Sequence, residues 1–446
     1  RAATALRRPT AAAADERVVL ALGSGEIAVF SGARGHPAAG LQPAHPRIVI
    51  ASPYLPFPLS HGGAVRMYNL IRRAASEFDQ VLVSFTEELR TPPAELLEIC
   101  TEIILVCRRG THIRRSTSRP DVVEEFASAA FDAALRYTVR KWHPAIAQLE
   151  FTQMAQYADG CRPARTILVE HDVTVDLYAQ LLEQHPDWET RRQWQLWLDF
   201  EEQAWRDVDA VVTMSRKDAR TVRNARRVTV LENGVDLERF RPAAEEPDPA
   251  RLLFIGSFAH LPNLLAVEWF LDNVWLRLVH LAPVFHIIGG RDHRFHYDRQ
   301  RQRVHVDFGT PGLEVEDFVP DPRPAYRRAT VVVAPLLASA GTNIKIMEAM
   351  AMGKAIVSTP GGVNGVDVVP GGDVLVSGDA GEQARMIERL LECPEERRAL
   401  ERRARATAER RYSWDRIASE QERLYRSLIA STRSSSVHRL LTRAAQ

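Results

Sequence analysis

The segment with the clearest capacity for chemistry lies in the second half of the chain. Gly341 and Thr342 follow an apolar stretch there and precede a predicted helix over Lys345–Met352. A helix N-terminus presents unpaired N–H groups and the positive end of the helix dipole, and both favour a phosphate. Lys345 lies in the first turn, where a cation opposes the dipole, so an anionic ligand would explain it. Glu348 follows on the same face, where its carboxylate can accept hydrogen bonds from two ribose hydroxyls. The alternative is an ordinary capped helix with an exposed Lys–Glu pair.

Two segments nearer the N-terminus also combine suitable residue types with a suitable position. Gly62 and Gly63 follow a short predicted strand, and glycines at such a turn allow the backbone to approach an anion closely. Glu170, His171 and Asp172 end another predicted strand, at the edge of an α/β sheet where ligands bind. Taken alone, the first pattern also fits a tight strand-to-helix turn, and the second fits a helix capped by Asp172.

Metal-binding patterns are weak in this sequence. Asp207-Val-Asp209 has the spacing of a D-x-D motif, but two carboxylates between a predicted helix and a predicted strand make a poor site. The four cysteines (Cys100, Cys107, Cys161 and Cys393) form no C-x-x-C pair. This argues against structural zinc and favours reduced thiols in a cytosolic protein. We therefore expect no metal site.

The composition narrows the class of protein. A length of 446 residues predicts two or three domains. Lys and Arg total 58 against 57 for Asp and Glu, and this near-cancellation argues against a nucleic-acid partner. No apolar run approaches the roughly 18 residues of a membrane span, and residues 1–20 lack the apolar core of a signal peptide, so we expect a cytoplasmic protein. The Arg-rich stretch Arg397–Arg411 alternates with Glu and predicts a solvated helix face. It leaves open a peripheral contact with anionic lipid, at the inner face of the membrane.

Strands and helices alternate along most of the chain, which predicts parallel sheets and an α/β class. Helical periodicity predicts helices at residues 63–78, 183–206, 263–278, 379–392 and 394–411. The segment 108–165 has the least regular pattern. Short apolar runs predict strands at residues 47–53, 81–85, 102–107, 166–170, 210–214 and 228–231, and again at 252–256, 285–289, 304–308, 330–335 and 355–359.

The alternation restarts after Arg241–Ala250, a segment with three prolines and no periodicity that is typical of an interdomain linker. We therefore expect two Rossmann-like, doubly wound domains that face each other across a cleft. Ligands in such sheets bind at the carboxyl ends of the strands, so the cleft is the expected site. The predicted divisions are an N-terminal arm or remnant of an upstream segment at 1–45, an N-terminal domain at 46–240, a C-terminal domain at 251–411, a helix at 412–430 that crosses back to the N-terminal domain, and a tail at 431–446.

With these residues in view, the chain over about 46–430 resembles the retaining GT-B glycosyltransferases of the group 1, or family 4, type. Members transfer a sugar from a nucleotide donor to an acceptor. Smaller matches are Phe318-Val-Pro-Asp321, where the family tends to hold the base, and Arg411-Tyr-Ser-Trp414, before its final helix. The main matches, in the order of the family, are Gly62-Gly63, His171-Asp172, the hinge segment Asn233-Gly-Val-Asp-Leu-Glu-Arg-Phe-Arg-Pro242, and the donor-site segment from Gly341 to Thr359.

The chain departs from the family pattern at two places, and in both it resembles a subgroup with a G-T-x-x-K-x-x-E-A-M-A helix. The usual helix carries E-x7-E, and Glu348 matches the second Glu while Ala340 stands at the first. The Arg and Lys that usually follow the first strand of the C-terminal domain are replaced by Gly256-Ser-Phe-Ala-His-Leu-Pro-Asn263. In that subgroup Lys345 takes over neutralisation of the diphosphate. The departures leave open a catalytically silent homologue.

The resemblance implies a metal-independent hexosyl transfer with retention of configuration. It implies a front-face reaction through an oxocarbenium-like transition state, without a protein nucleophile and without a cofactor. A nucleotide-diphosphate sugar is then the co-substrate. His171, Lys345 and Glu348 are the implied catalytic residues. The implied donor-binding residues are Gly62, Gly63, Asn233, Gly256, Pro320, Asp321, Gly341, Thr342, Asn343, Lys345 and Glu348.

Bacterial relatives of this type often build cell-surface polysaccharide, so the resemblance implies a saccharide or lipid-linked acceptor and a role in polysaccharide or glycoconjugate synthesis. Two alternatives remain within the same fold, namely a sugar-nucleotide epimerase and a silent binding module. A nicotinamide-dependent oxidoreductase is disfavoured because no G-x-G-x-x-G follows a strand.

Overall fold

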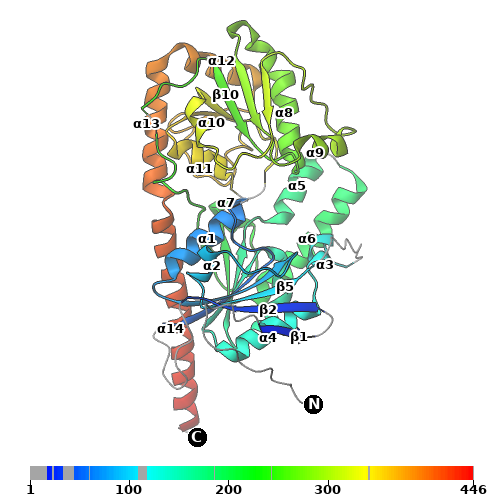
Figure 1. Ribbon diagram of the computed structural model, residues 1–446, viewed down its shortest axis with the longest axis vertical. Helices are drawn as coiled ribbons and strands as arrows, with labels where there is room; N and C mark the ends of the chain where they lie inside the picture. Colours follow the sequence, from blue (N-terminus) through cyan, green and yellow to red (C-terminus); the bar gives the residue numbers. More distant parts are fainter. Residues whose placement is uncertain are drawn as a thin grey trace, which may run out of the picture.

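Two α/β domains lie one above the other in the computed structural model, and a long C-terminal helix runs beside the lower, N-terminal domain (Figure 1). The predicted fold class is therefore confirmed. The structure describes residues 18–22, 25–33, 45–59, 61–108, 118–184, 186–242, 244–339 and 342–444.

The N-terminal domain is built on a nine-stranded sheet with the order β1-β2-β5-β4-β3-β6-β7-β8-β9. All pairs from β5 to β9 are parallel, whereas β2 pairs antiparallel with both β1 and β5. The two apolar runs of the N-terminal arm thus form strands at one edge of this sheet. The strands are β1 (Val18–Leu22), β2 (Gly25–Ser31), β3 (Arg47–Ser52), β4 (Asp79–Thr86), β5 (Glu102–Cys107), β6 (Ile146–Glu150), β7 (Arg165–Glu170), β8 (Ala210–Thr213) and β9 (Val228–Val230).

The C-terminal domain has a six-stranded, fully parallel sheet with the order β12-β11-β10-β13-β14-β15. Its central strands are buried and rich in Val, Ile and Leu, as expected for a parallel sheet covered on both faces. The strands are β10 (Arg251–Ile255), β11 (Val284–Ile288), β12 (Leu313–Glu316), β13 (Val331–Ala334), β14 (Ala355–Ser358) and β15 (Leu375–Val376).

The predicted strand at 304–308 is wrong. Val304 and Val306 are buried, but they lie in an irregular segment before β12. The turn that follows explains the difference, because the Asp307 carboxylate accepts a hydrogen bond from Gly309 N and its carbonyl accepts one from Thr310 Oγ1. Asp307 therefore bonds to the backbone of a local turn in place of a sheet partner.

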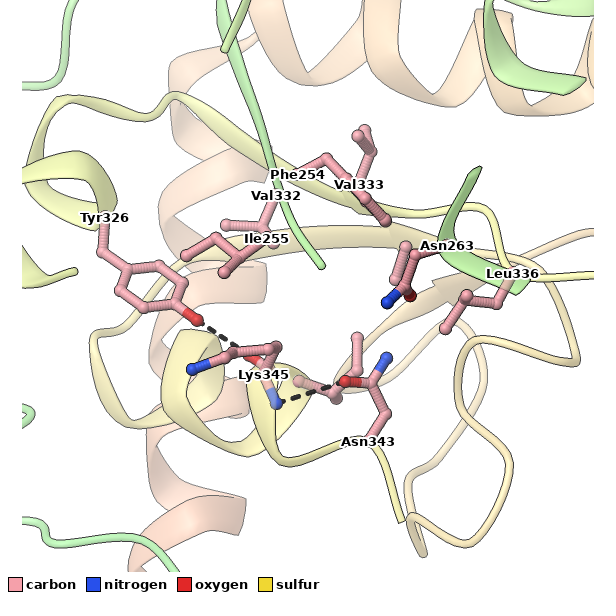
Figure 2. Close-up of a pocket in the computed structure, with 11 residues that line it drawn as sticks. Phe254, Ile255, Asn263, Tyr326, Val332, Val333, Leu336, Asn343 and Lys345 are labelled. Carbon is pink, nitrogen blue, oxygen red and sulfur yellow. Dashed lines mark hydrogen bonds between the residues drawn. The ribbon is translucent and has the colours of Figure 1, made fainter. Parts of the chain in front are cut away.

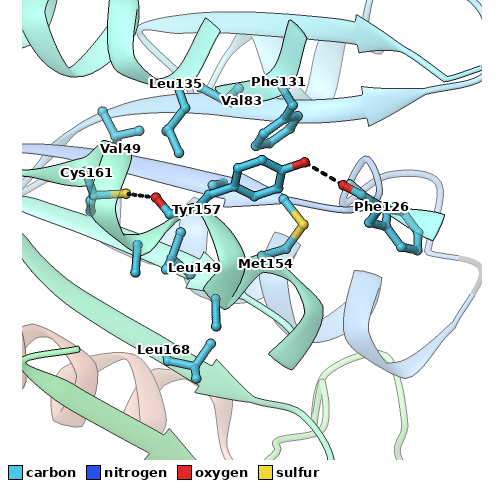
Figure 3. Packing of buried hydrophobic residues seen from close by; sticks show 14 of the residues in the cluster. Val49, Val83, Phe126, Phe131, Leu135, Leu149, Met154, Tyr157, Cys161 and Leu168 are labelled. Carbon is cyan, nitrogen blue, oxygen red and sulfur yellow. Dashed lines mark hydrogen bonds between the residues drawn. The ribbon is translucent and has the colours of Figure 1, made fainter. Parts of the chain in front are cut away.

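Segment 108–165 completes the core of the N-terminal domain. Its helices are α3 (Asp121–Glu125), α4 (Ala129–Trp142) and the 3-10 helix η1 (Thr152–Cys161). Figure 3 shows Tyr157 of η1 among Phe131, Leu135 and Met154, with its hydroxyl donating to the carbonyl of Phe126. This packing fixes the position of β6 and of the chain that leaves it.

Two interdomain crossings lie side by side. One follows β9, and the other joins α13 (Pro394–Arg411) to α14 (Trp414–Ala444). Val235 N donates to Tyr412 O at 2.7 Å, and Val235 forms a parallel bridge with Ser413. Trp414 is 1% exposed and packs with Leu70 of α1 (Gly62–Ala74). The C-terminal helix therefore docks on the N-terminal domain.

Gly234 is pressed against the second crossing, and a methyl group there should destabilise the protein. A Cβ at Gly234 would lie 2.6 Å from Cδ2 of the buried Trp414 ring. Overpacking against a rigid ring costs about 1–3 kcal/mol, so Gly234→Ala should lower the free energy of unfolding by that amount in denaturant titrations. Gly378→Ala is the control, because its nearest neighbour is Pro360 Cδ at 3.9 Å. Equal stability of the two variants would contradict this packing.

Candidate active site

The helix α11 (Ile344–Ala351) begins at the carboxyl end of β13. Asn343 is its N-cap and accepts a hydrogen bond from Lys345 N at 3.2 Å, while its amide donates to Gly362 O. Thr342 Oγ1 donates to Gly365 O at 3.5 Å. No acidic residue occupies the first turn, so nothing in that turn neutralises the positive end of the dipole. Gly341 lies outside the described residues.

A small pocket opens where α11 meets the ends of β10 and β13. Figure 2 shows Asn343 and Lys345 on one side of it and Asn263 on the other. Asn263 belongs to α8 (Leu261–Asn273) and donates to Ser257 O at 2.8 Å. The strands β10 and β13 are sequence-distant neighbours in the sheet, and such a switch point is where open α/β sheets bind ligands.

Glu348 is buried one turn below Lys345, and both are held in place. Lys345 Nζ donates to Glu348 Oε2 at 2.9 Å, and Tyr326 OH donates to the same oxygen at 3.0 Å. Tyr326 lies on α10 (Arg323–Arg328) and is fully buried, and burial together with the charge of Glu348 raises its pKa well above its usual value. Within the described residues, Glu348 Oε1 accepts no hydrogen bond. That oxygen is therefore available to a ligand hydroxyl.

The helix α1 begins directly opposite, at the carboxyl end of β3. Its N-cap His61 accepts a hydrogen bond from Ala64 N through Nδ1, and its first turn has no acidic residue. A Cβ at Gly62 would lie 2.8 Å from Ile344 Cδ1 of α11. The N-termini of α1 and α11, one from each domain, therefore meet across the cleft.

His171 lies beside this meeting point, at the end of β7, and is 7% exposed. Its Nε2 is 2.7 Å from Glu150 Oε2, and its ring stacks on Phe151 with centroids 3.8 Å apart. Phe151 has a φ of 70° and a ψ of 146°, a strained conformation for a residue other than glycine. A Cβ at Gly63 would lie 2.4 Å from Phe151 Cζ. The missing side chain of Gly63 thus makes room for the ring that supports His171.

Further titratable groups line the cleft. Burial lowers the pKa of His61, and the electrostatic effect of the neighbouring His171 and His260 lowers it further. Desolvation raises the pKa of Asp172, whereas His171 and His260 lower it. Asp172 as a whole residue is exposed at the surface. His260, at the N-cap of α8, brings the C-terminal domain to this group.

The remaining predicted donor-binding residues are distributed over three places. Gly256 follows β10 and packs against the pocket residue Asn263. Pro320 and Asp321 lie in the loop before α10, where an ion pair with Arg323 lowers the pKa of Asp321. Asn233 is buried at the interdomain crossing and accepts a hydrogen bond from Arg66 Nη1 at 3.0 Å. The structure thus brings Gly256 to the pocket, but it places Asn233 at the hinge.

No sequence motif identified four further residues of the site, namely Glu150, Phe151, His260 and Tyr326. Glu150 and Phe151 end β6, in the segment with the weakest pattern, and His260 lies in the loop that replaces the usual basic residues. An apolar–polar alternation ending in Glu150 was the available signal for β6.

Within the described residues, no group of three or more His, Cys, Asp or Glu side chains is placed to hold a metal ion. Asp209 of the D-x-D pattern bonds instead to Arg165 Nη1 at 2.8 Å and to Thr166 N at 3.0 Å. In the same part of the chain, every helix is too short or too polar to cross a membrane.

Two conserved-domain families match the chain in consecutive segments. Residues 60–239 match the family described as Glycosyltransferase Family 4, and residues 249–393 match the family described as Glycosyl transferases group 1. A search of curated proteins found no match.

Solved structures of the same fold cover most of the chain. Sucrose-phosphate synthase from Thermosynechococcus elongatus is 18% identical, with a TM-score of 0.68 over 87% of this chain and 100% of its own. Anabaena HepE in complex with UDP-glucose is 14% identical, with a TM-score of 0.60 over 88% of this chain and 100% of its own. The trehalose 6-phosphate synthase of Burkholderia multivorans is 12% identical, with a TM-score of 0.62 over 87% and 100%.

Two Rossmann-like domains that face each other through helix N-termini define the GT-B class of fold. The two matched families occupy these same two domains in order. The chain is therefore a glycosyltransferase of the GT-B type.

Two buried carboxylates lie behind His171. Glu170 accepts hydrogen bonds from Trp205 Nε1 at 2.7 Å and from Thr152 Oγ1, yet burial raises its pKa to about 7. Glu201 accepts hydrogen bonds from Thr174 N and Val175 N. Burial and the charge of Glu170 raise the pKa of Glu201 well above its usual value.

Glu170→Gln should stabilise the protein in a pH-dependent way. A raised pKa means that the folded state holds a proton that the unfolded state has lost. The free energy of unfolding therefore falls as the pH rises from about 4.5 to about 7. The amide removes this cost and can keep both hydrogen bonds. We expect the free energy of unfolding to rise by about 1–3 kcal/mol at pH 8 and by much less at pH 5. Glu98→Gln, at an exposed position, is the control and should change the free energy of unfolding by the same amount at both pH values. An equal effect of Glu170→Gln at pH 5 and pH 8 would refute the raised pKa.

Proposed function

We propose that this glycosyltransferase moves a sugar from a nucleotide-diphosphate sugar to a saccharide or lipid-linked acceptor with retention of configuration. Its role would be in surface polysaccharide or glycoconjugate synthesis. The observation that carries the donor class is the meeting of two helix N-termini, each without an acidic residue in its first turn, at Gly62 and Ile344. Two dipole ends and Lys345 supply a positive field for a diphosphate.

Each side chain has a role that follows from its position. The diphosphate would lie against Thr342, Asn343 and Lys345, at the start of α11. Glu348, fixed through Oε2 by Tyr326 and Lys345, would accept ribose hydroxyls through Oε1. His171 would contact the donor sugar or the departing phosphate from the N-terminal domain.

Catalysis would then rest on fixed charge at the leaving group. As the glycosidic bond breaks, negative charge grows on the phosphate oxygen. Lys345 and the backbone N–H groups at the start of α11 would face that oxygen from fixed positions, so little reorganisation would be needed. Closure of the two domains would exclude water, which competes with the acceptor for the sugar. This account needs neither a protein nucleophile nor a metal ion.

Two other functions fit the same fold. A sugar-nucleotide epimerase would release free sugar and nucleotide without an acceptor. A silent module would bind the donor without turnover. Mass spectrometry of products from a nucleotide-sugar panel, with and without acceptor extracts, separates these cases. Retention is tested separately by the anomeric configuration of the product in NMR spectra.

Lys345→Ala should abolish donor binding while the protein remains folded. The lysine opposes the helix dipole and its side chain is 41% exposed, so its loss should change the melting temperature of the free protein little. A ligand at 100 times its Kd stabilises by about 2.7 kcal/mol, and we expect this thermal shift with the cognate nucleotide sugar to vanish. Glu348→Ala should likewise weaken binding through the ribose.

Arg389→Ala is the matched control, because it removes an exposed ion pair between Arg389 of α12 (Ala380–Glu392) and Glu396 of α13, two other helices of the same domain. This variant should keep the full shift. Unchanged donor shifts and transfer rates in both Lys345→Ala and Glu348→Ala would overturn the assignment of the donor site.

A further inference from the structure

A chain of buried hydrogen bonds connects the C-terminal helix to the active-site histidine. Tyr425 of α14 donates from its hydroxyl to Gln148 Oε1 at 2.6 Å. The amide of Gln148 donates to Glu150 Oε1 at 2.5 Å, and Glu150 Oε2 lies 2.7 Å from His171 Nε2. All four side chains are buried, and Tyr425 is only 1% exposed.

The direction of these bonds sets the state of the histidine ring. A carboxylate can only accept, so Nε2 of His171 carries the proton that it donates to Glu150. In the neutral ring Nδ1 is then the acceptor, and Nδ1 is the nitrogen that remains for a ligand. Stacking on Phe151 fixes the plane of the ring. Glu150 thus selects one tautomer of His171 and one orientation.

A buried cation, Arg66, lies close enough to Glu150 to interact with it electrostatically. Arg66 of α1 is 1% exposed, and burial lowers its pKa to about 10 against the opposing effect of the Glu150 charge. Arg66 Nη1 also donates to Glu232 O at 2.8 Å and to Asn233 Oδ1 at 3.0 Å, at the interdomain crossing. The same group of side chains therefore reaches α14, the hinge and the cleft.

We propose that Glu150 is a positioning residue that sets the tautomer and orientation of His171, and that Tyr425 and Gln148 hold Glu150 in place, so that docking of α14 is required for an active His171. The proposal rests on the proposed function for its kinetic effect. Its structural effect, the tautomer of His171, is independent of that function.

Tyr425→Phe is the most selective test, since it removes one hydroxyl and keeps the aromatic ring packed against Phe78. We expect a fall in kcat of about tenfold, as misplaced catalytic groups produce, and little change in the donor-induced thermal shift. Glu150→Gln should have a larger effect. In a His171→Ala background, Tyr425→Phe should cause no further loss, because Tyr425 acts through His171.

Arg426→Gln is the matched control on the same helix. It breaks the exposed pairs with Glu77 and Glu422 and leaves the buried chain intact, so kcat should stay at the wild-type value. A structural role for Tyr425 alone would lower activity equally with and without His171, and that result would overturn the proposal.

Long-range 1H–15N spectra of histidine-labelled protein provide the second readout, with His171 assigned from its loss in His171→Ala. The wild type should show the Nε2–H tautomer, and Tyr425→Phe and Glu150→Gln should shift the signals towards a mixture. Unchanged His171 signals in both variants would refute the positioning role. If the wild type neither binds nor transfers a sugar, the proposed function fails, while these spectra still decide the role of Glu150.

Discussion

The site depends on one electrostatic arrangement, the approach of two helix N-termini from opposite domains. The positive ends of α1 and α11 repel each other, and Lys345 adds to the repulsion. The close approach of Gly62 and Ile344 therefore requires stabilising contacts in other parts of the protein. An anion between the two ends would turn the repulsion into attraction on both sides. The same geometry that selects the ligand thus couples binding to domain closure.

In the described structure, these stabilising contacts are made by the two interdomain crossings and by α14. Val235 and Tyr412 bond the crossings to each other, and Trp414 anchors the second crossing against α1. Because α1 also provides the N-terminus at the cleft, the position of that N-terminus depends on the C-terminal helix. The helix is accordingly a structural part of both domains, although it lies along the N-terminal one (Figure 1).

Most of the fold and half of the site could be predicted from local sequence pattern. Buried parallel strands leave continuous apolar runs, as in Val331–Ala334, and a helix that begins after such a run identifies a site on its own. Lys345 and Glu348 were therefore accessible to sequence reasoning. A run with similar residues at 304–308 failed, because Val304 and Val306 are buried by tertiary contacts in a loop, and apolar residues alone do not distinguish the two cases.

The other half of the site, which supports His171 in the N-terminal domain, could not be predicted, because its polar residues interrupt the apolar pattern of a buried strand. Gln148 and Glu150 are polar residues in a central strand, so β6 lacks the apolar run of its neighbours. Their burial is tolerable because they bond to each other and, at either end, to Tyr425 and His171 from distant segments, and no local pattern records those two distant partners. Phe151 also depends on a residue that is distant in the sequence. Its backbone costs about 1–3 kcal/mol in strain, and the ring fits only because Gly63, nearly ninety residues away, lacks a Cβ. The strained backbone of Phe151 places its ring against the ring of His171. We infer that this positioning of His171 is the reason why the strain is retained.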